Sequence, residues 1–210
     1  MVYDDLYWDF EALKAANVYG TDYHVLVGVK NPKIIYTAIH GGGIETGTTE
    51  LAIFSAGTKD SYYCFEGFKS SGNSVLHVTS THFDEPNGRQ LVAASDYTIS
   101  YHGYSDSAVK NTKIGGLDTE LKEAILDSLI AAGFNAELED PADSVIPGVE
   151  PENIANCNRR KMGVQLEIST LQRTSIFGTN TRLGRRLTVN AEFNKYVKAI
   201  NDAVASVVTK

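Results

Sequence analysis

Apolar residues along the chain fall into short runs rich in Val and Ile, set between longer stretches with helical spacing. Two of these runs, residues 24–30 and 33–40, are separated by the turn dipeptide Asn31-Pro32. β-Branched runs bounded by turn residues predict strands. We expect these two strands to be neighbours, with the second ending at His40.

Other runs predict further strands. They are residues 61–65, 75–80, 97–102, 135–139 and 163–168. Each is short and bounded by polar or glycine-containing segments, as expected for strands of a globular sheet.

Three stretches predict helices. Residues 48–54 are helix-compatible and end near Gly57. Asp118 can cap a second helix, whose apolar residues recur at four-residue spacing before Gly133 stops it. The third closes the chain with one apolar stripe: Phe193, Val197, Ile200, Val204 and Val207.

The alternation of strands and helices predicts an α/β fold. We expect residues 1–210 to form a single domain, a three-layer sandwich with a mixed central sheet, and residues 139–160 to form a loop-rich excursion. Ligands of such domains gather at the carboxyl ends of the strands. Side chains at those ends are therefore the first candidates for a site.

Composition narrows the function. The net charge of −7 argues against a general nucleic-acid binder. Residues 150–190 nevertheless hold seven lysine or arginine residues and only three acids, which suggests a local site for a carboxylate-bearing ligand. No apolar stretch is long enough to span a membrane, so we expect a soluble protein. The acidic start, residues 1–6, does not resemble a secretory signal, and the compartment stays undetermined.

Cys64 and Cys157 are the two cysteines of the chain. Two thiols in a chain of this size do not make a disulfide framework. We expect both to be unpaired, although a single bridge is compatible with the sequence. Neither lies in an evident nucleophile motif, which disfavours a thiol hydrolase.

The segment from His40 to Glu45 is the strongest chemical signal. His40 ends a predicted strand, three glycines follow it, and Glu45 comes next beside a predicted helix start. The glycines permit close backbone approach to a bound group. Two histidines and one carboxylate can hold a zinc ion and leave one position open. A satisfied core histidine and a helix-dipole carboxylate are the structural alternatives.

His102 and Glu167 complete this interpretation. His102 has the same context as His40, a strand end followed by glycine, and is our third metal ligand. Glu167 interrupts an apolar strand, and a buried carboxylate requires a partner. Either Arg159 or Arg160 neutralises it, or it acts as a general base toward water. We favour the base.

The three other histidines and two arginines receive roles outside the metal-ligand set. His82 lies beside two acids and is a candidate substrate contact, while His24 and His77 are expected to be structural. Arg159 and Arg160 are candidates for binding substrate and stabilising developing negative charge.

Three segments together carry a family resemblance. They are residues 40–45, residues 81–86 and residues 158–167, supported by Tyr101-His102-Gly103-Tyr104-Ser105. The chain resembles the phage-type poly-γ-glutamate hydrolases, zinc peptidases of the carboxypeptidase-A-like superfamily. In ordinary carboxypeptidases two residues separate the first ligand pair, whereas four separate His40 from Glu45, a spacing that the hydrolase group shares.

The resemblance implies a truncated zinc-carboxypeptidase-like scaffold with one Zn²⁺ per chain. It implies cleavage of γ-glutamyl amide bonds inside bacterial poly-γ-glutamate, and we expect a monomer with no nucleic-acid or membrane partner. Two alternatives stay open: a zinc-dependent deacylase of small N-acyl amino acids, and a non-catalytic module whose glycines cradle an anion.

Overall fold

A computed structural model describes residues 5–208; residues 1–4, part of the acidic start discussed above, and residues 209–210 lie outside the described chain. The strands are β1 (Tyr23–Gly28), β2 (Asn31–Gly42), β3 (Asp60–Gly67), β4 (Tyr97–Tyr104), β5 (Thr112–Gly116), β6 (Ala136–Leu138) and β7 (Val164–Ser169). The helices are α1 (Phe10–Ala16), α2 (Thr48–Ala56), α3 (Pro86–Ala93), α4 (Thr119–Ala131), α5 (Thr170–Ser175), α6 (Arg182–Leu187) and α7 (Ala191–Val208), with 3₁₀ turns η1 (Asn73–Leu76) and η2 (Ile154–Asn156).

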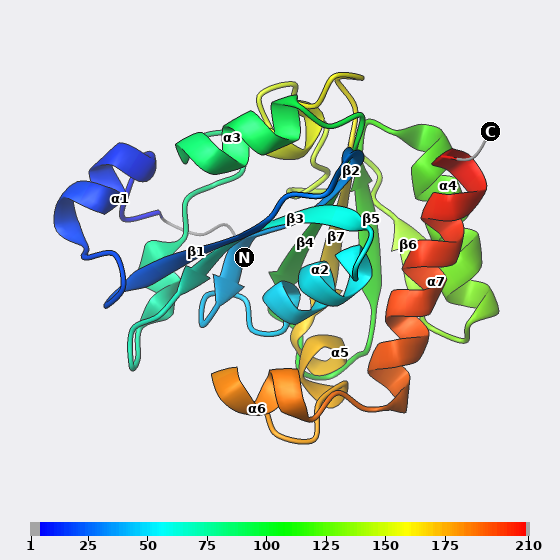
Figure 1. Cartoon of the computed structure of the whole chain (residues 1–210). Helices are drawn as coiled ribbons and strands as arrows, with labels where there is room; N and C mark the ends of the chain where they lie inside the picture. The colour runs from blue at the N-terminus through cyan, green and yellow to red at the C-terminus, as the bar shows by residue number, and fades with distance from the viewer. Residues whose placement is uncertain (1–4, 209–210) are drawn as a thin grey trace.

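The described strands form one mixed sheet in the order β1-β3-β2-β4-β7-β5-β6 (Figure 1). Its centre, β3-β2-β4-β7, is parallel, while β1 and β5 run antiparallel to their central neighbours. The carboxyl ends of the four central strands therefore meet at one edge of the sheet.

Two apolar clusters cover the two faces of this sheet. One packs β2, β4 and β7 against α2, α4 and α7, and the other packs β2 and β3 against α1, α3 and the turns η1 and η2. Figure 1 shows α4 and α7 on one side of the sheet and α1 and α3 on the other. The structure thus has the three layers and the mixed sheet that the sequence predicts.

Period-two alternation in β4 and β7 explains how polar groups come to lie in this interior. Val164, Leu166 and Ile168 face the α4–α7 layer. The intervening Gln165 and Glu167 point to the opposite face, as residues of alternate parity do in a strand. Glu167 therefore lies on the face of β7 opposite the α4–α7 layer and does not interrupt the apolar face.

Most of the predicted elements are confirmed. The predicted helices correspond to α2, α4 and α7, and the side chain of Asp118 caps α4 by accepting a hydrogen bond from the backbone N of Leu121. Gly133 follows α4 with a φ of 78°, in the left-handed region that favours glycine. Both cysteines are free.

Two predictions about strands are wrong. β1 and β2 are not neighbours, because β3 lies between them and pairs with both. Residues 75–80 do not form a strand: η1 and an irregular segment cross the face of the sheet there, and Leu76 and Val78 fill the second apolar cluster. An apolar run alone does not distinguish a strand from a buried crossing segment.

Within residues 5–208 no helix combines the length and apolar character needed to cross a bilayer.

Candidate metal centre

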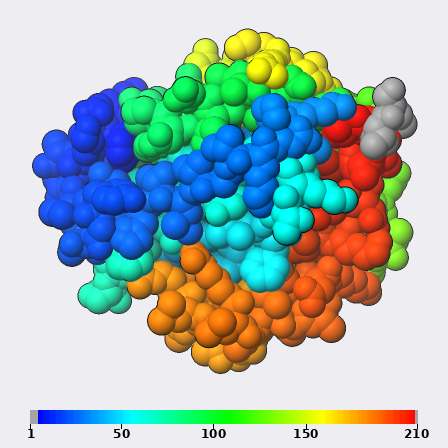
Figure 2. Space-filling view, in the orientation of Figure 1, coloured from blue at the N-terminus to red at the C-terminus, as the bar shows by residue number. Residues whose placement is uncertain are grey.

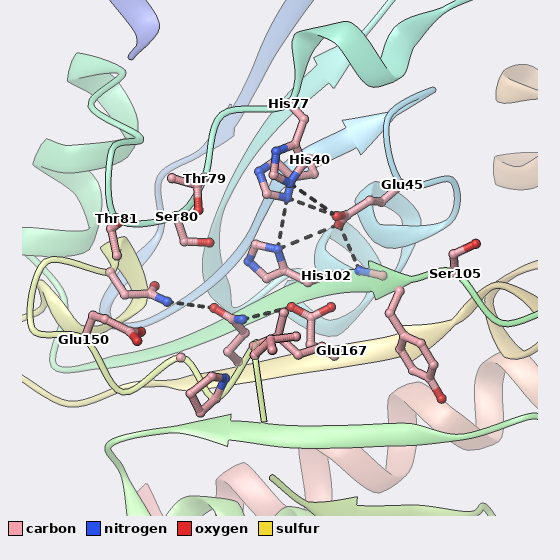
Figure 3. Close-up of a pocket in the computed structure, with 18 residues that line it drawn as sticks. His40, Glu45, His77, Thr79, Ser80, Thr81, His102, Ser105, Glu150 and Glu167 are labelled. Carbon is pink, nitrogen blue, oxygen red and sulfur yellow. Dashed lines mark hydrogen bonds and ion pairs between the residues drawn. The ribbon is translucent and has the colours of Figure 1, made fainter. Parts of the chain in front are cut away.

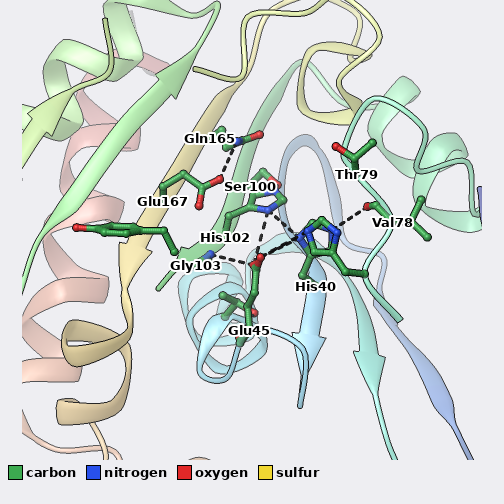
Figure 4. A network of polar contacts seen from close by, with 12 residues as sticks. His40, Glu45, Val78, Thr79, Ser100, His102, Gly103, Gln165 and Glu167 are labelled. Carbon is green, nitrogen blue, oxygen red and sulfur yellow. Dashed lines mark hydrogen bonds and ion pairs between the residues drawn. The ribbon is translucent and has the colours of Figure 1, made fainter. Parts of the chain in front are cut away.

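The metal candidates lie where the parallel strands end. His40 is near the end of β2, His102 is near the end of β4, and Glu45 lies in the short turn between β2 and α2. All three side chains are almost completely buried. Figure 4 shows the carboxylate of Glu45 between the two imidazole rings.

Their ligand atoms form a small triangle. His40 Nδ1 lies 3.1 Å from His102 Nδ1 and 3.2 Å from Glu45 Oε1, and His102 Nδ1 lies 3.7 Å from Glu45 Oε2. Two atoms bound tetrahedrally to one zinc ion at about 2.0–2.1 Å lie about 3.3 Å apart. The triangle therefore has the dimensions of a zinc ligand set.

Hydrogen bonds on the far side of each group fix these atoms. His40 Nε2 lies 2.8 Å from the carbonyl oxygen of Val78, which can only accept, so His40 donates there and turns Nδ1 inward. His102 Nε2 lies 2.9 Å from Ser100 Oγ, and the backbone N of Gly103 donates to Glu45 Oε2 at 2.9 Å. Outer partners of this kind orient metal-binding imidazoles.

Charges inside the cluster shift its pKa values. Burial lowers the pKa of His40, but the adjacent Glu45 carboxylate outweighs it and raises that pKa overall. Burial favours the neutral form of Glu45 and so raises its pKa. The nearby groups His40, His102 and Arg173 outweigh burial, and the pKa of Glu45 is lowered overall. Burial together with repulsion from His40 lowers the pKa of His102 to about 3. Electron-rich atoms that converge in this way require a cation, either a proton or a metal ion.

His77, which the sequence assigned to a structural role, also lies at this centre. Its ring stacks on His40 with 3.8 Å between centroids, and its Nε2 lies 3.9 Å from Glu45 Oε1. Asp5 holds the other ring nitrogen, with 2.5 Å between Asp5 Oδ1 and His77 Nδ1. His40, Glu45 and His77 also have ligand atoms within 4.8 Å of one another. His77 is thus a second candidate for the third ligand.

Glu167 lies beside His102, because the two are register partners on β7 and β4. Gln165 Nε2 donates to Glu167 Oε1 at 2.9 Å, and Asn153 Nδ2 donates to Gln165 Oε1 at 2.8 Å (Figure 3). Burial, followed by repulsion from Glu45, raises the pKa of Glu167 to about 8. A carboxyl group whose pKa lies near neutral pH can both take up and give back a proton there.

A cavity of about 300 Å³ opens over these groups. His40, Glu45, His77, His102 and Glu167 line it, with Thr79, Ser80, Ser105, Glu150 and the loop from Val145 to Gly148 around them. Figure 3 shows the labelled side chains arranged around this space. Of the lining residues in the described part of the chain, none is a lysine or an arginine.

Arg159 and Arg160, which the sequence predicts to bind substrate and to stabilise developing negative charge, do not line this cavity. Arg159 pairs with Asp96 at 3.4 Å, and Arg160 pairs with the capping carboxylate of Asp118 and stacks on Tyr97. Their partners flank the amino ends of β4 and β7, at the opposite edge of the sheet from the cavity. The charges of these two arginines are neutralised by acids that lie outside residues 150–190.

His82 and Asp106 also lie outside the cavity lining. The ring of His82 stacks on Trp8 with 3.6 Å between centroids, although Thr81 before it does line the cavity. Asp106, in the loop after β4, accepts hydrogen bonds from the backbone N of Ala108 and Val109.

Arg173 is a buried residue of the site that the sequence did not single out. Its Nε donates to the carbonyl oxygen of Ile168 and its Nη1 to that of Thr46. It approaches so closely beneath Gly103 that a Cβ there would lie 2.2 Å from Nε. Its charge contributes to the lowered pKa of Glu45 and partly opposes the rise in the pKa of Glu167. Arg173 thus joins the ends of β4 and β7 to the turn between β2 and α2, and it partly offsets the buried carboxylates.

Fold and site together define an α/β protein with a candidate metal centre at the carboxyl edge of its sheet. The sequence matches the family described as Poly-gamma-glutamate hydrolase over residues 7–199. The chain belongs to this family, which makes it a hydrolase.

Individual relatives agree with this assignment. YoqZ, an SPbeta prophage-derived protein of Bacillus subtilis, is 44% identical over 204 residues, which are 95% of this chain and 73% of YoqZ. A solved bacteriophage poly-gamma-glutamate hydrolase superposes with a TM-score of 0.92 and 41% identity, covering 98% of this chain and 99% of that one. A zinc-free apo structure of YndL, a Bacillus subtilis protein, has a TM-score of 0.90 and 38% identity, covering 96% and 98%.

A more distant structure shows how widely the fold is shared. N-formylglutamate amidohydrolase from Ralstonia eutropha has a TM-score of 0.53 at 10% identity, covering 88% of this chain and 97% of that one. That likeness concerns the fold alone.

Proposed function

We propose that this chain is a zinc-dependent hydrolase that cuts γ-glutamyl amide bonds within bacterial poly-γ-glutamate. His40, Glu45 and His102 hold one zinc ion, and Glu167 is the general base. Residues 1–210 act as a single catalytic domain and as a monomer. The observation that carries the proposal is the triangle of two Nδ1 atoms and one carboxylate beside a buried carboxyl group of raised pKa.

The donor set fits zinc. Imidazole nitrogen and carboxylate oxygen are usual ligands of catalytic zinc, and three protein ligands leave a position open toward the cavity. A bound zinc ion would supply Lewis acidity toward the substrate carbonyl and toward water. The zinc-free form recorded for YndL supports the choice of this metal.

Glu167 performs the proton transfers in this scheme. Gln165 occupies Glu167 Oε1, which leaves Oε2 to accept a proton from the attacking water. The protonated carboxyl group then passes that proton to the nitrogen of the departing amine. The raised pKa helps the second step, because the proton remains on Glu167 until the leaving nitrogen needs it.

The substrate is proposed from the family and from the bacteriophage enzyme that this chain resembles. Thr79, Ser80 and Ser105 place hydroxyl groups around the cavity, where they can donate to amide and carboxylate oxygens.

Two measurements on the purified protein test the proposal. Elemental analysis should find one zinc per chain, and a chelator should abolish activity that added zinc restores. Poly-γ-glutamate solutions should lose viscosity well before many free amines appear, since internal cuts shorten long chains fastest. A metal-free protein with full activity would overturn the zinc assignment. Release of acyl groups from N-acyl glutamate with unchanged polymer viscosity would establish a deacylase instead.

A further inference from the structure

A second cavity adjoins the candidate metal centre. It has a volume of about 530 Å³ and is lined by Gly42, Gly43, residues 67–70, Asn73 and residues 180–185 except Gly184. The segment from His40 to Glu45 separates the two cavities. Its ends line the cavity over the candidate metal ligands, which we call the metal cavity, and Gly42 and Gly43 line the second one. Gly43 and Glu45 are two residues apart, so the two spaces lie within roughly 7 Å along the backbone.

The wall of this second cavity is closely packed. Arg185 Nη2 donates to the carbonyl oxygen of Gly42 at 3.0 Å, and a Cβ on Gly43 would lie 2.5 Å from Asn73 Nδ2. In Figure 1, α6 lies below the arrowhead of β2, and in Figure 2 the orange segment that contains α6 adjoins the cyan and teal segments. The cavity therefore belongs to the same edge of the sheet as the metal centre.

Most cations of this region are already neutralised. Arg185 pairs with Glu50, and Arg186 pairs with Glu66 and Glu50. These contacts join α6 to α2 and β3, and they are structural.

Arg182 differs from its neighbours. Its guanidinium carbon lies 3.2 Å from the ring centroid of Phe68, and within residues 5–208 no carboxylate comes within ion-pair distance of it. A guanidinium stacked by its face keeps its N–H edge for a planar bidentate acceptor, and a carboxylate matches that geometry.

Two further donors face the same space. Lys69 pairs with Asp22 at 2.9 Å, and its ammonium group has three hydrogens for that one contact. Asn180 accepts from Arg185 through its carbonyl oxygen, which leaves its NH₂ group to donate. Arg182, Lys69 and Asn180 thus form a donor set suited to an anion.

The metal cavity is lined by acidic side chains, in contrast to the cationic second cavity. Glu45, Glu150 and Glu167 line it, and no lysine or arginine in the described part of the chain does so. The proposed substrate carries one free α-carboxylate on every residue, and these groups must be stabilised near the cleaved bond without entering that acidic space. Each γ-linked residue contributes five bonds to the main chain of the polymer, more than an α-linked residue does. The α-carboxylate of the next residue therefore lies further from the cleaved amide than it would in an α-linked peptide.

We propose that the cavity between Phe68, Lys69, Asn180 and Arg182 is a subsite for a free α-carboxylate of poly-γ-glutamate, one or a few residues from the cleaved amide. This inference rests on the proposed function and adds a second recognition site to it. The subsite binds substrate through Arg182 as the bidentate partner and Lys69 as a supporting charge.

The test compares Arg182→Gln and Lys69→Gln with Arg89→Gln, which removes one positive charge from α3, away from both cavities. With long poly-γ-glutamate, Arg182→Gln should raise KM about tenfold, the usual effect of losing one charge-assisted contact, and Lys69→Gln should raise it less. With poly-γ-glutamate whose α-carboxylates are blocked as methyl esters, Arg182→Gln and the wild type should have the same kcat/KM, because the subsite then has no carboxylate to bind. Arg89→Gln should match the wild type on both substrates.

Binding is measured separately from turnover. Calorimetry measures the affinity of zinc-loaded Glu167→Gln protein for a poly-γ-glutamate fragment, and this affinity should fall with added salt. In the double variant Glu167→Gln/Arg182→Gln the affinity should be about tenfold lower. Wild-type KM values in both Arg182→Gln and Lys69→Gln would overturn the subsite while leaving the hydrolase intact. A wild-type protein that neither binds nor cuts the polymer would overturn the proposed function itself.

Discussion

The cavity over the metal candidates, at the carboxyl edge of the central sheet, and the amino edge of that sheet treat charge in opposite ways. At the carboxyl edge, Glu45 and Glu167 are buried in a cavity that is lined with imidazoles and has no lysine or arginine in its described lining. At the amino edge, Arg159 pairs with Asp96 and Arg160 with Asp118. Buried charge is costly unless it is compensated. The cavity that leaves carboxylates to be balanced by a cation from outside is the region suited to catalysis, and the compensated amino edge stabilises the fold.

The largest effect should come from Glu167. In Glu167→Gln the amide cannot accept a proton, so kcat on poly-γ-glutamate should fall by about 10²–10⁴-fold while zinc content stays near one per chain. Steady-state kinetics with elemental analysis of the same sample checks this. A variant that kept near-normal kcat would remove Glu167 from the mechanism.

The same substitution should stabilise the metal-free protein. Because burial and Glu45 raise the folded pKa of Glu167 to about 8, from an ordinary value of 4.5, ionisation opposes folding. The stabilising contribution of protonated Glu167 is therefore fully present below pH 4.5 and is lost as the pH rises toward 8. Glu167→Gln removes this loss, worth on the order of 3 kcal/mol at pH 7. Thermal unfolding of zinc-free samples should therefore show a gain that is near zero at pH 4 and grows toward pH 8.

The third metal ligand can be decided by comparing His102 with His77. If His102 is the ligand, His102→Ala should lower zinc affinity by more than about a hundredfold, whereas His77→Ala, which removes an outer group, should lower it by about tenfold or less. Competition with a zinc-sensitive dye measures both. The reverse order would establish the set His40, Glu45 and His77, whose atoms also lie close together.

A smaller effect is expected at Gln165, which positions Glu167. Replacing it with Leu removes the donor to Glu167 Oε1 and should lower kcat about tenfold with unchanged zinc content. That hydrogen bond lowers the pKa of Glu167, so its loss should raise the pKa and move the acid limb of the kcat/KM profile to higher pH. A loss of activity without movement of the acid limb would indicate general damage to the cavity.

The local part of the site could be predicted from the sequence. His40, Glu45, His102 and Glu167 all follow from a local signal: a strand end beside glycines, or a charged residue inside an apolar strand. Parallel strands bring such ends together without any knowledge of the partner side chains. The structure places all four around one cavity.

Groups whose environment is made by distant residues could not be predicted in this way. Arg160 is neutralised by Asp118, 42 positions earlier, and His77 is held by Asp5, 72 positions earlier. Counting charges within residues 150–190 could not show that Glu50 and Glu66 neutralise Arg185 and Arg186. The prediction that β1 and β2 are neighbours was wrong for the same reason. β3, which comes later in the sequence, lies between these two consecutive strands.

The smallest effect on activity should come from the compensated edge. Asp118 is buried, caps α4 at the backbone N of Leu121 and accepts an ion pair from Arg160. Arg160→Gln leaves that carboxylate without its cation and should cost about 1 kcal/mol of unfolding free energy, a fall in Tm of about 2–4 °C for a chain of this size. Its kcat and KM on poly-γ-glutamate should stay at wild-type values, because Arg160 lies at the far edge of the sheet from the cavity. A tenfold loss of kcat with unchanged Tm would mean that Arg160 acts on the substrate after all, and that the contrast between the two edges does not separate catalysis from stability.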